Sequence, residues 1–180
     1  MPTTFQLPAE ATAKLLPSTQ QNIVRYYDDP QAGDVDRASI RELLDAQAWT
    51  ELDDRFFRDI AFGTGGMRGR TIGKIVTKAE QGKPQPLDRP EFPGAGTNML
   101  NFGNVHRAVS ALGAYLIEGY PGQKLKVVIS HDTRHFSRPF AEAAAKALNA
   151  LGIDALLFPE TAPRRSFPSP RARPRRTPAS

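Results

Sequence analysis

An α/β fold is predicted by three neighbouring features in the second half of this 180-residue chain. Residues 126–130 form a short apolar run, residues 137–151 carry apolar side chains at helical spacing, and residues 153–158 form a second apolar run. A strand, a helix and a strand in this order make a βαβ unit. We therefore expect at least one pair of parallel strands connected by a helix.

The N-terminal part of the chain predicts helices. Prolines interrupt residues 1–20, so we expect no long helix there. Ser39 and Glu42 have the spacing of a capping box, although Asp34 or Asp36 could cap an earlier start. A second apolar stretch follows this helix. A helical hairpin is therefore expected ahead of the glycine-rich segment described below.

The middle of the chain is expected to be mostly irregular. Residues 71–76 suggest a short strand or turn, and residues 82–96 suggest a loop because four prolines and four charges show no periodicity. A helix follows, with Asn101 or Asn104 as its N-cap. Its expected buried face consists of Val105, Ala108, Val109, Leu112, Tyr115 and Leu116.

Residues 62–69, Phe-Gly-Thr-Gly-Gly-Met-Arg-Gly, are the strongest candidate for a binding site. Glycine reaches positive φ and lets backbone N–H groups approach an anion closely. With the hydroxyl of Thr64 and the forked donors of Arg68, the N–H groups around Gly65 and Gly66 suit a phosphate or a phosphorylated sugar. A tight glycine turn with a surface arginine remains the alternative, because short glycine motifs are common.

A polar turn follows the strand predicted at 126–130. Ligands of open α/β sheets gather beyond the carboxyl ends of the strands, where Asp132 and Arg134 stand. We favour a structural role for them, with Asp132 holding Arg134 and Ser137 capping the next helix. His131 and His135 are assigned no chemistry, because no carboxylate or nucleophile stands at a recognisable spacing.

Charge and composition exclude several classes of function. Residues 161–180 carry six arginines and no acid, which exceeds the net charge of +5, so residues 1–160 carry −1. Nucleic-acid binding is therefore expected only through this segment, as a basic arm. A shift of reading frame near codon 161 is the interpretation we favour for its arginine, proline and serine content. The segment is expected to be disordered.

The remaining composition points to a protein of the cytoplasm. The chain has no cysteine, which excludes disulfides and thiolate metal sites and fits a reducing compartment. No apolar run is long enough for a membrane span, and no secretory signal is recognisable. Three scattered histidines do not favour a histidine-rich metal site.

Taken in order, the motifs resemble the N-terminal domain I of the α-D-phosphohexomutases over residues 20–160. The motifs are the glycine loop at 62–69, Gly-Ala-Gly-Thr-Asn at 94–98, and Val-Val-Ile-Ser-His-Asp-Thr-Arg-His-Phe-Ser-Arg at 127–138, followed by the alanine-rich helix. The resemblance is closest to the bacterial phosphoglucomutase branch that includes phosphopentomutase-like members. It implies an incomplete three-layer α/β/α domain I with a mixed sheet over residues 55–160, a helical extension over 1–54, and a tail over 161–180.

The resemblance also implies a reaction. Family members are isomerases of carbohydrate metabolism: Mg²⁺-dependent intramolecular phosphotransferases in which a phosphoserine exchanges phosphoryl groups with a hexose or pentose phosphate. Thr64, Gly65, Gly66 and Arg68 would bind substrate phosphate, with Arg68 beside the phosphoserine. The turn at 132–134 would support this site through Asp132 and Arg134.

The sequence departs from the family in ways that matter for activity. It has no Thr-Ala-Ser-His-Asn-Pro type serine loop, no Asp-rich Mg²⁺ loop and no Gly-Glu sugar-selecting loop, and Met99 stands where relatives commonly carry arginine. Relatives continue after Glu160 with a Pro-Thr-Pro segment. We therefore expect a truncated phosphoglucomutase/phosphomannomutase that is inactive alone and lacks catalytic and metal-binding residues. The alternatives are a stand-alone sugar-phosphate-binding module and polyanion binding through the tail.

Overall fold

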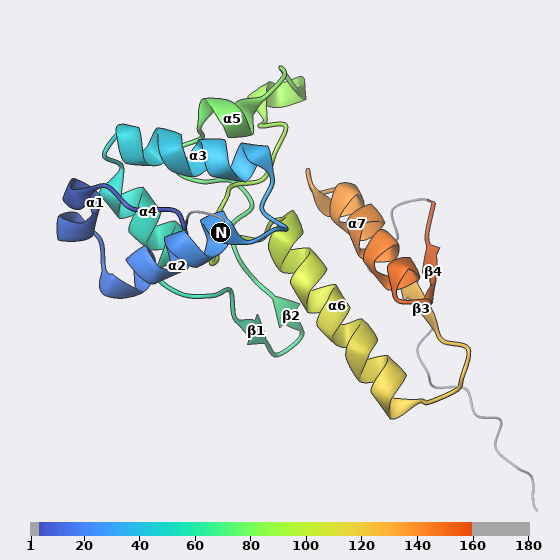
Figure 1. Cartoon of the computed structure of the whole chain (residues 1–180). Helices are drawn as coiled ribbons and strands as arrows, with labels where there is room; N and C mark the ends of the chain where they lie inside the picture. The colour runs from blue at the N-terminus through green and yellow to red at the C-terminus, as the bar shows by residue number, and fades with distance from the viewer. Residues whose placement is uncertain (1–3, 160–180) are drawn as a thin grey trace, which may run out of the picture.

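A computed structural model describes residues 4–159. Figure 1 shows α1–α5 gathered on one side and α6, α7, β3 and β4 on the other. The elements are α1 (Ala9–Lys14), α2 (Pro17–Asp28), α3 (Asp34–Asp45), α4 (Trp49–Phe56), β1 (Phe62–Gly63), β2 (Gly66–Met67), α5 (Lys78–Gln81), a 3-10 turn (Pro86–Asp88), α6 (Phe102–Gly119), β3 (Lys126–Ile129), α7 (Ser137–Ala150) and β4 (Asp154–Leu157). The expectations for Glu160 and for residues 161–180 lie outside the described residues.

The predicted βαβ unit is present. β3 and β4 pair in parallel with Val128 opposite Leu156, and α7 connects them. The second described sheet is the antiparallel hairpin β1–β2. Helices and small sheets together confirm an α/β fold. The three-layer arrangement with a mixed sheet remains a prediction.

The N-terminal helices pack around a shared apolar core. Their buried side chains include Ile23 from α2, Leu43 from α3, and Leu52 and Phe56 from α4. α2 begins at Pro17, because proline at the first helical position forfeits only an N–H that has no partner within the helix. Proline there begins a helix rather than interrupting one.

Ser39 does not cap α3: the alternative of an earlier start is confirmed, although the N-cap is Gly33 rather than Asp34 or Asp36. The helix begins at Asp34, where the Asp36 carboxylate accepts the Gly33 N–H at 3.0 Å. Ser39 is instead buried inside the helix and donates to Glu80 of α5 at 2.6 Å. A partner 41 residues away therefore decides the role of this hydroxyl.

The stripe predicted for α6 is only partly buried. Asn101 caps the helix by accepting the Asn104 N–H at 3.0 Å, as expected, and Val105 is buried. Leu112 and Tyr115, in contrast, are 45% and 71% exposed. The helix packs on α7 through Gly113, where an added Cβ would lie 2.5 Å from Leu151 Cδ1. The absence of a side chain at Gly113 thus sets which face of α6 meets α7.

Residues 71–76 contain no strand, which leaves the alternative of a turn-like connection. The Thr71 carbonyl accepts the Gly94 N–H, whereas the Lys74 N–H and the Ile75 carbonyl bond to side chains of α4.

The cap expected at Ser137 was wrong. Ser137 is the first residue of α7 rather than its cap, and its hydroxyl accepts the Asp132 N–H at 3.0 Å. Pro139 does lie in the first turn of α7, as predicted.

Candidate functional site

The glycine-rich motif folds into a short hairpin. Phe62 pairs with Met67 and Gly63 pairs with Gly66, so that Thr64 and Gly65 form the turn. Gly65 and Gly66 have φ values of +116° and +129°, which L side chains rarely adopt. A Cβ at either position would meet no atom within 4 Å. Backbone conformation, and not crowding, therefore requires glycine here.

The predicted phosphate-binding residues lie on the outside of this hairpin. Thr64, Gly65 and Arg68 are exposed and Gly66 is half-buried. Within residues 4–159, the Arg68 guanidinium has no ion-pair or hydrogen-bond partner. The described part of the chain thus leaves its planar donors available to an external anion.

Residues 94–100 hold the two ends of the hairpin together. The Ile60 N–H, before the hairpin, donates to Thr97 O at 2.7 Å, and the Leu100 N–H donates to Arg70 O, after the hairpin, at 2.8 Å. Gly69 lies so close to this loop that an added Cβ would come within 3.3 Å of both Asn98 O and Leu100 N. We call residues 94–100 the clamp loop.

Two buried asparagines fix the clamp loop. The Asn101 amide donates to Gly94 O and Gly96 O at 3.2 and 3.0 Å. The Asn104 amide donates to three carbonyls of the same loop, those of Gly96, Thr97 and Met99. The sequence predicts Asn101 and Asn104 only as caps. Their amides also donate to the Gly94 and Met99 carbonyls and add a second donor at the Thr97 carbonyl, which already accepts the Ile60 N–H.

Met99, also in the clamp loop, is a core residue. Its side chain is 1% exposed, and added Cβ atoms at Gly94 and Gly96 would lie 2.8 Å from it. It provides no polar group to a ligand.

The turn after β3 is held by its own side chains. Asp132 accepts the Arg134 N–H at 3.0 Å, and its other oxygen lies 3.4 Å from Arg134 Nε. The Arg134 N–H, the hydrogen bond with Ser137 and the Arg134 charge lower the pKa of Asp132, and they outweigh a small effect of burial. Asp132 is therefore ionised at neutral pH and positions the arginine that follows it.

One cavity brings the end of the glycine motif together with this turn. Its volume is about 270 Å³, and its lining residues are Gly69, Thr71, Leu100, Asp132, Arg134, His135, Phe136, Ser137 and Phe140. Thr71 and Ser137 bring hydroxyls, and Arg134 brings a positive charge. Thr64, Gly65, Gly66 and Arg68 are not among the lining residues. Asp132 and Arg134 thus share a cavity with the C-terminal end of the glycine motif but not with its turn.

His135 makes a structural contact between two segments of the chain. Its Nε2 lies 2.7 Å from Pro90 O, which connects the α7 side of the cavity to the loop before residue 94.

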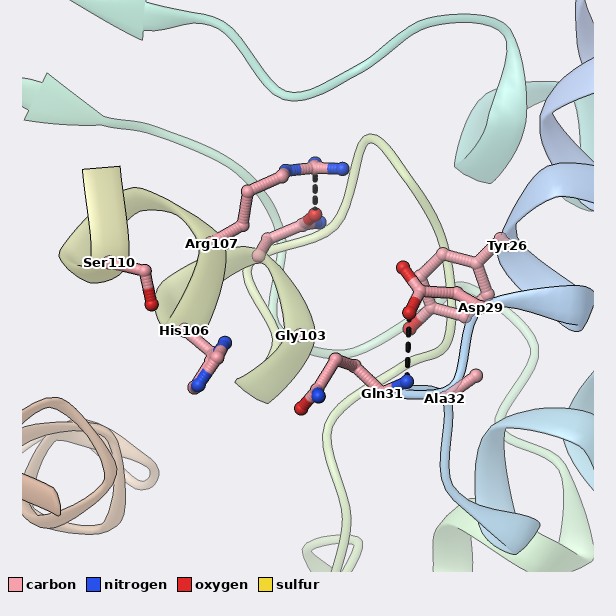
Figure 2. Close-up of a pocket in the computed structure, with 9 residues that line it drawn as sticks. Tyr26, Asp29, Gln31, Ala32, Gly103, His106, Arg107 and Ser110 are labelled. Atoms are coloured by element: carbon pink, nitrogen blue, oxygen red, sulfur yellow. Dashed lines mark hydrogen bonds between the residues drawn. The ribbon is translucent and has the colours of Figure 1, made fainter. Parts of the chain in front are cut away.

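A second cavity lies between the α2–α3 connection and the start of α6, as Figure 2 shows. Its volume is about 240 Å³, and it contains none of the residues predicted for the site. The charged groups at its wall are already engaged: Arg107 donates to the Asn104 side chain, and Asp29 accepts the Gln31 N–H at 2.8 Å. Its chemistry does not favour a particular ligand.

Sequence reasoning also missed the most buried charges near the hairpin. Arg55 lies against Glu51 and Glu80, and Arg55 O accepts the Asn98 N–H of the clamp loop at 2.9 Å. Glu51 and Arg55 have the i, i+4 spacing of a helical ion pair, which was the available signal. Nothing in the local sequence predicts Glu80 as the third member.

The described residues do not fit the Mg²⁺ ion that the resemblance implies. Across residues 4–159, no three His, Asp or Glu side chains are grouped so that they could hold a metal ion. Mg²⁺ prefers several oxygen ligands in octahedral geometry. We derive no chemical step that uses a metal.

A membrane span is likewise not found among the described helices: none of them is long and apolar enough to cross a bilayer.

Comparison with known proteins gives one match. Neither the curated proteins nor the solved structures include a match to this chain. Residues 93–167, less than half of the chain, match the family model described as phosphoglucomutase/phosphomannomutase, alpha/beta/alpha domain I. The matched segment contains the whole clamp loop and the 132–134 turn, whereas the glycine hairpin lies before it. At this level the match supports the resemblance to the domain I family of phosphohexomutases.

Proposed function

We propose that this chain supplies the phosphate-recognition part of a phosphohexomutase-type site for a hexose or pentose phosphate. The observation that carries the proposal is the cavity shared by Gly69 and Thr71 with the Asp132–Ser137 turn. The family match includes that turn, and the reaction of the family is an intramolecular phosphoryl transfer on sugar phosphates. The bacterial branch and a cytoplasmic location belong to the same proposal, whereas the Mg²⁺ of the family reaction would need ligands from outside residues 4–159.

The chemistry of the cavity suits one phosphoryl group. The Arg134 guanidinium can hold two phosphate oxygens, and the hydroxyls of Thr71 and Ser137 can donate to others. The cavity also lies at the first turn of α7, where the helix dipole favours an anion. Because Asp132 already accepts from Arg134, its negative charge is partly compensated. Arg68 does not line this cavity, but it directly precedes Gly69, which does, and we propose that it adds a second positive charge to a dianionic phosphate from beside the cavity.

Binding is tested by ligand-induced stabilisation. Glucose 1-phosphate and inorganic phosphate should raise the melting temperature of the wild type, and glucose alone should not. At a ligand concentration of 100 times Kd the gain is about 2.7 kcal/mol. Arg134→Ala and Arg68→Ala should each reduce affinity about tenfold or more, as expected for a lost charge-assisted contact.

Arg138→Ala is the matched control. Arg138 is an exposed arginine four residues after Arg134, pairs with Glu142 at 2.9 Å and does not line the cavity. If Arg134→Ala and Arg138→Ala lose the same amount of phosphate affinity, the loss reflects net charge alone, and the assignment of the cavity is overturned.

Binding of a sugar phosphate by these 180 residues does not require that they catalyse phosphoryl transfer. Because the sequence has no serine loop of the family type, we expect no phosphoserine donor and no interconversion of glucose 1-phosphate and glucose 6-phosphate. The assay is a coupled measurement of glucose 6-phosphate formation with Mg²⁺ and glucose 1,6-bisphosphate present. Turnover above a heat-denatured sample would contradict this expectation.

A further inference from the structure

Arg55 is a fully buried charge within a cluster that the proposed chemistry does not use. Its side chain is 0% exposed, and the carboxylates of Glu51 and Glu80 beside it are also buried. Burial alone would lower the pKa of Arg55, but hydrogen bonds and charges from Glu80 and Glu51 raise it. The cluster therefore holds one permanent positive charge against two carboxylates, with Arg70 3.9 Å from Glu51 at its edge.

The donors of Arg55 reach four separate segments. Nε donates to Glu51 on the same helix at 2.7 Å, and Nη1 donates to Glu80 of α5. Nη2 donates to Ile75 O, and Nη1 lies 3.4 Å from Ala95 O in the clamp loop. Only the planar fork of arginine offers this many directed donors from one side chain.

The surrounding backbone packs tightly against Arg55 at two glycines, which have no side chain. An added Cβ at Gly73 would lie 1.9 Å from Arg55 Nη2, and one at Gly96 would lie 2.7 Å from Arg55 O. Ala95, next to Gly96 in the clamp loop, is buried and its N–H donates to Glu80 at 3.1 Å. These loops have few apolar side chains with which to fix themselves, so polar contacts to the Arg55 cluster take that role.

The clamp loop continues from this cluster to the glycine hairpin. It bonds to Arg55 O through Asn98, to Ile60 before the hairpin through Thr97, and to Arg70 after the hairpin through Leu100. Gly94 adds a bond from its N–H to Thr71 O at 2.8 Å, next to the shared cavity. A continuous set of hydrogen bonds thus leads from Arg55 to both ends of the hairpin and to Thr71.

We infer that Arg55 is a positioning residue: its buried contacts with Glu51, Glu80, Ile75 O and Ala95 O fix the clamp loop and thereby the ends of the glycine hairpin. Apolar residues of equal size often match the stability of a buried ion cluster. Directed contacts to several loops, in contrast, specify one arrangement of them. The consequence for phosphate binding rests on the proposed function, whereas the consequence for the clamp loop does not.

Hydrogen exchange of single amides in the full chain tests the inference directly. In Arg55→Lys, which keeps the charge but loses the fork, the Ile60, Asn98 and Leu100 amides should exchange about tenfold faster or more. Amides inside α7, such as Ala144 and Leu148, should keep wild-type rates. Leu43→Ala is the control for general destabilisation, because it opens the shared apolar core, which also includes Ala95, without removing a polar contact of the Arg55 cluster.

Two outcomes would overturn the inference. One is unchanged exchange at Ile60, Asn98 and Leu100 in Arg55→Lys. The other is faster exchange everywhere, in the same proportions as in Leu43→Ala. Should Arg55→Lys fail to fold, Glu51→Gln retains volume and an acceptor and must show the same local effect.

Phosphate titration separates the two proposals. If the wild type binds inorganic phosphate, Arg55→Lys should weaken binding about tenfold or more while Leu43→Ala, still folded at the assay temperature, retains affinity. If Arg55→Lys leaves the phosphate affinity unchanged, the position of the clamp loop does not affect the phosphate site. If the wild type binds no phosphate, the proposed function fails, and the exchange rates alone still decide whether Arg55 positions the loop.

Discussion

Asp36 shows at the scale of one residue how a helix start can depend on the fold. Its carboxylate accepts the Gly33 N–H at the start of α3 and the Tyr26 hydroxyl at 3.0 Å. Burial, as the largest cause, raises its pKa, although these two hydrogen bonds oppose the shift. The pKa of Tyr26 is raised well above its usual value by burial and then by the Asp36 charge. The pair therefore favours the form in which at least one group keeps its proton.

The raised pKa of Asp36 predicts a pH dependence of stability. Because the folded-state value lies above the unfolded one, the stabilising contribution is complete below the unfolded pKa and is lost as pH rises through the folded pKa. Asp36→Asn should therefore lack the loss of unfolding free energy that the wild type shows as pH rises from about 3 to 7.

Urea unfolding at a series of pH values makes the comparison. Asp34→Asn is the control, because Asp34 is the neighbouring acid in the first turn of α3 and its side chain is exposed. It should keep the wild-type trend. If Asp36→Asn and the wild type change in parallel with pH, Asp36 does not titrate as described.

At the scale of elements, α6 is fixed at its start by polar contacts and along its length by small residues. Asn101 both caps the helix and donates to the clamp loop. Gly113 permits the close approach of α7. The residues predicted for the buried face, Leu112 and Tyr115, instead line a cavity of about 430 Å³ that also involves Phe62 and Met67 of the hairpin. One face of α6 thus borders the cavity beside the hairpin, and another packs against α7.

Two substitutions separate the roles of Asn101. Asn101→Ser keeps a capping oxygen but loses the amide that satisfies Gly94 O, whereas Asn101→Ala loses both. We expect Asn101→Ala to lower the free energy of unfolding by about 1 kcal/mol more than Asn101→Ser does, from the cap alone. Both should cost about 1–3 kcal/mol for the unpaired Gly94 carbonyl.

Denaturant unfolding of the three proteins measures both contributions. Equal stability of the alanine and serine variants would show that the cap contributes nothing. If Asn101→Ser is as stable as the wild type, the amide of Asn101 contributes nothing to stability.

At the scale of the molecule, the parallel pair β3–β4 leaves apolar surface uncovered. Val128 and Leu156 are opposite each other and are 59% and 53% exposed. Parallel sheets are generally covered on both faces, whereas in the described part of the chain only one face is packed by helices. Such a surface with open strand edges favours association between copies of the chain.

Leu156→Lys should therefore reduce self-association. We expect the wild type to sediment with a mass that rises with concentration, and the variant to show a smaller rise, because charge on an open strand opposes pairing. Tyr120→Lys, at another exposed aromatic residue outside the two strands, is the matched control. If both variants behave alike, the sheet face is not the associating surface.

Local patterns in the sequence determined the elements of this protein. Apolar spacing located α7 and the two parallel strands, two candidate caps (Asn101 and Asn104) marked the start of α6, and the glycines at 65 and 66 marked a backbone with positive φ. Each of these rests on forces between residues close in the chain. Together with the family match, these local patterns also support the α/β fold.

Tertiary structure decided how those elements are used. It buried Ser39 against Glu80, exposed Tyr115, gathered Glu51, Arg55 and Glu80 into one cluster, and brought Thr71 to the same cavity as Asp132. Apart from the Glu51–Arg55 pair, these contacts join residues that are tens of positions apart in the sequence, and no local pattern encodes them. Helix periodicity states which residues share a face, but only packing decides which face is covered.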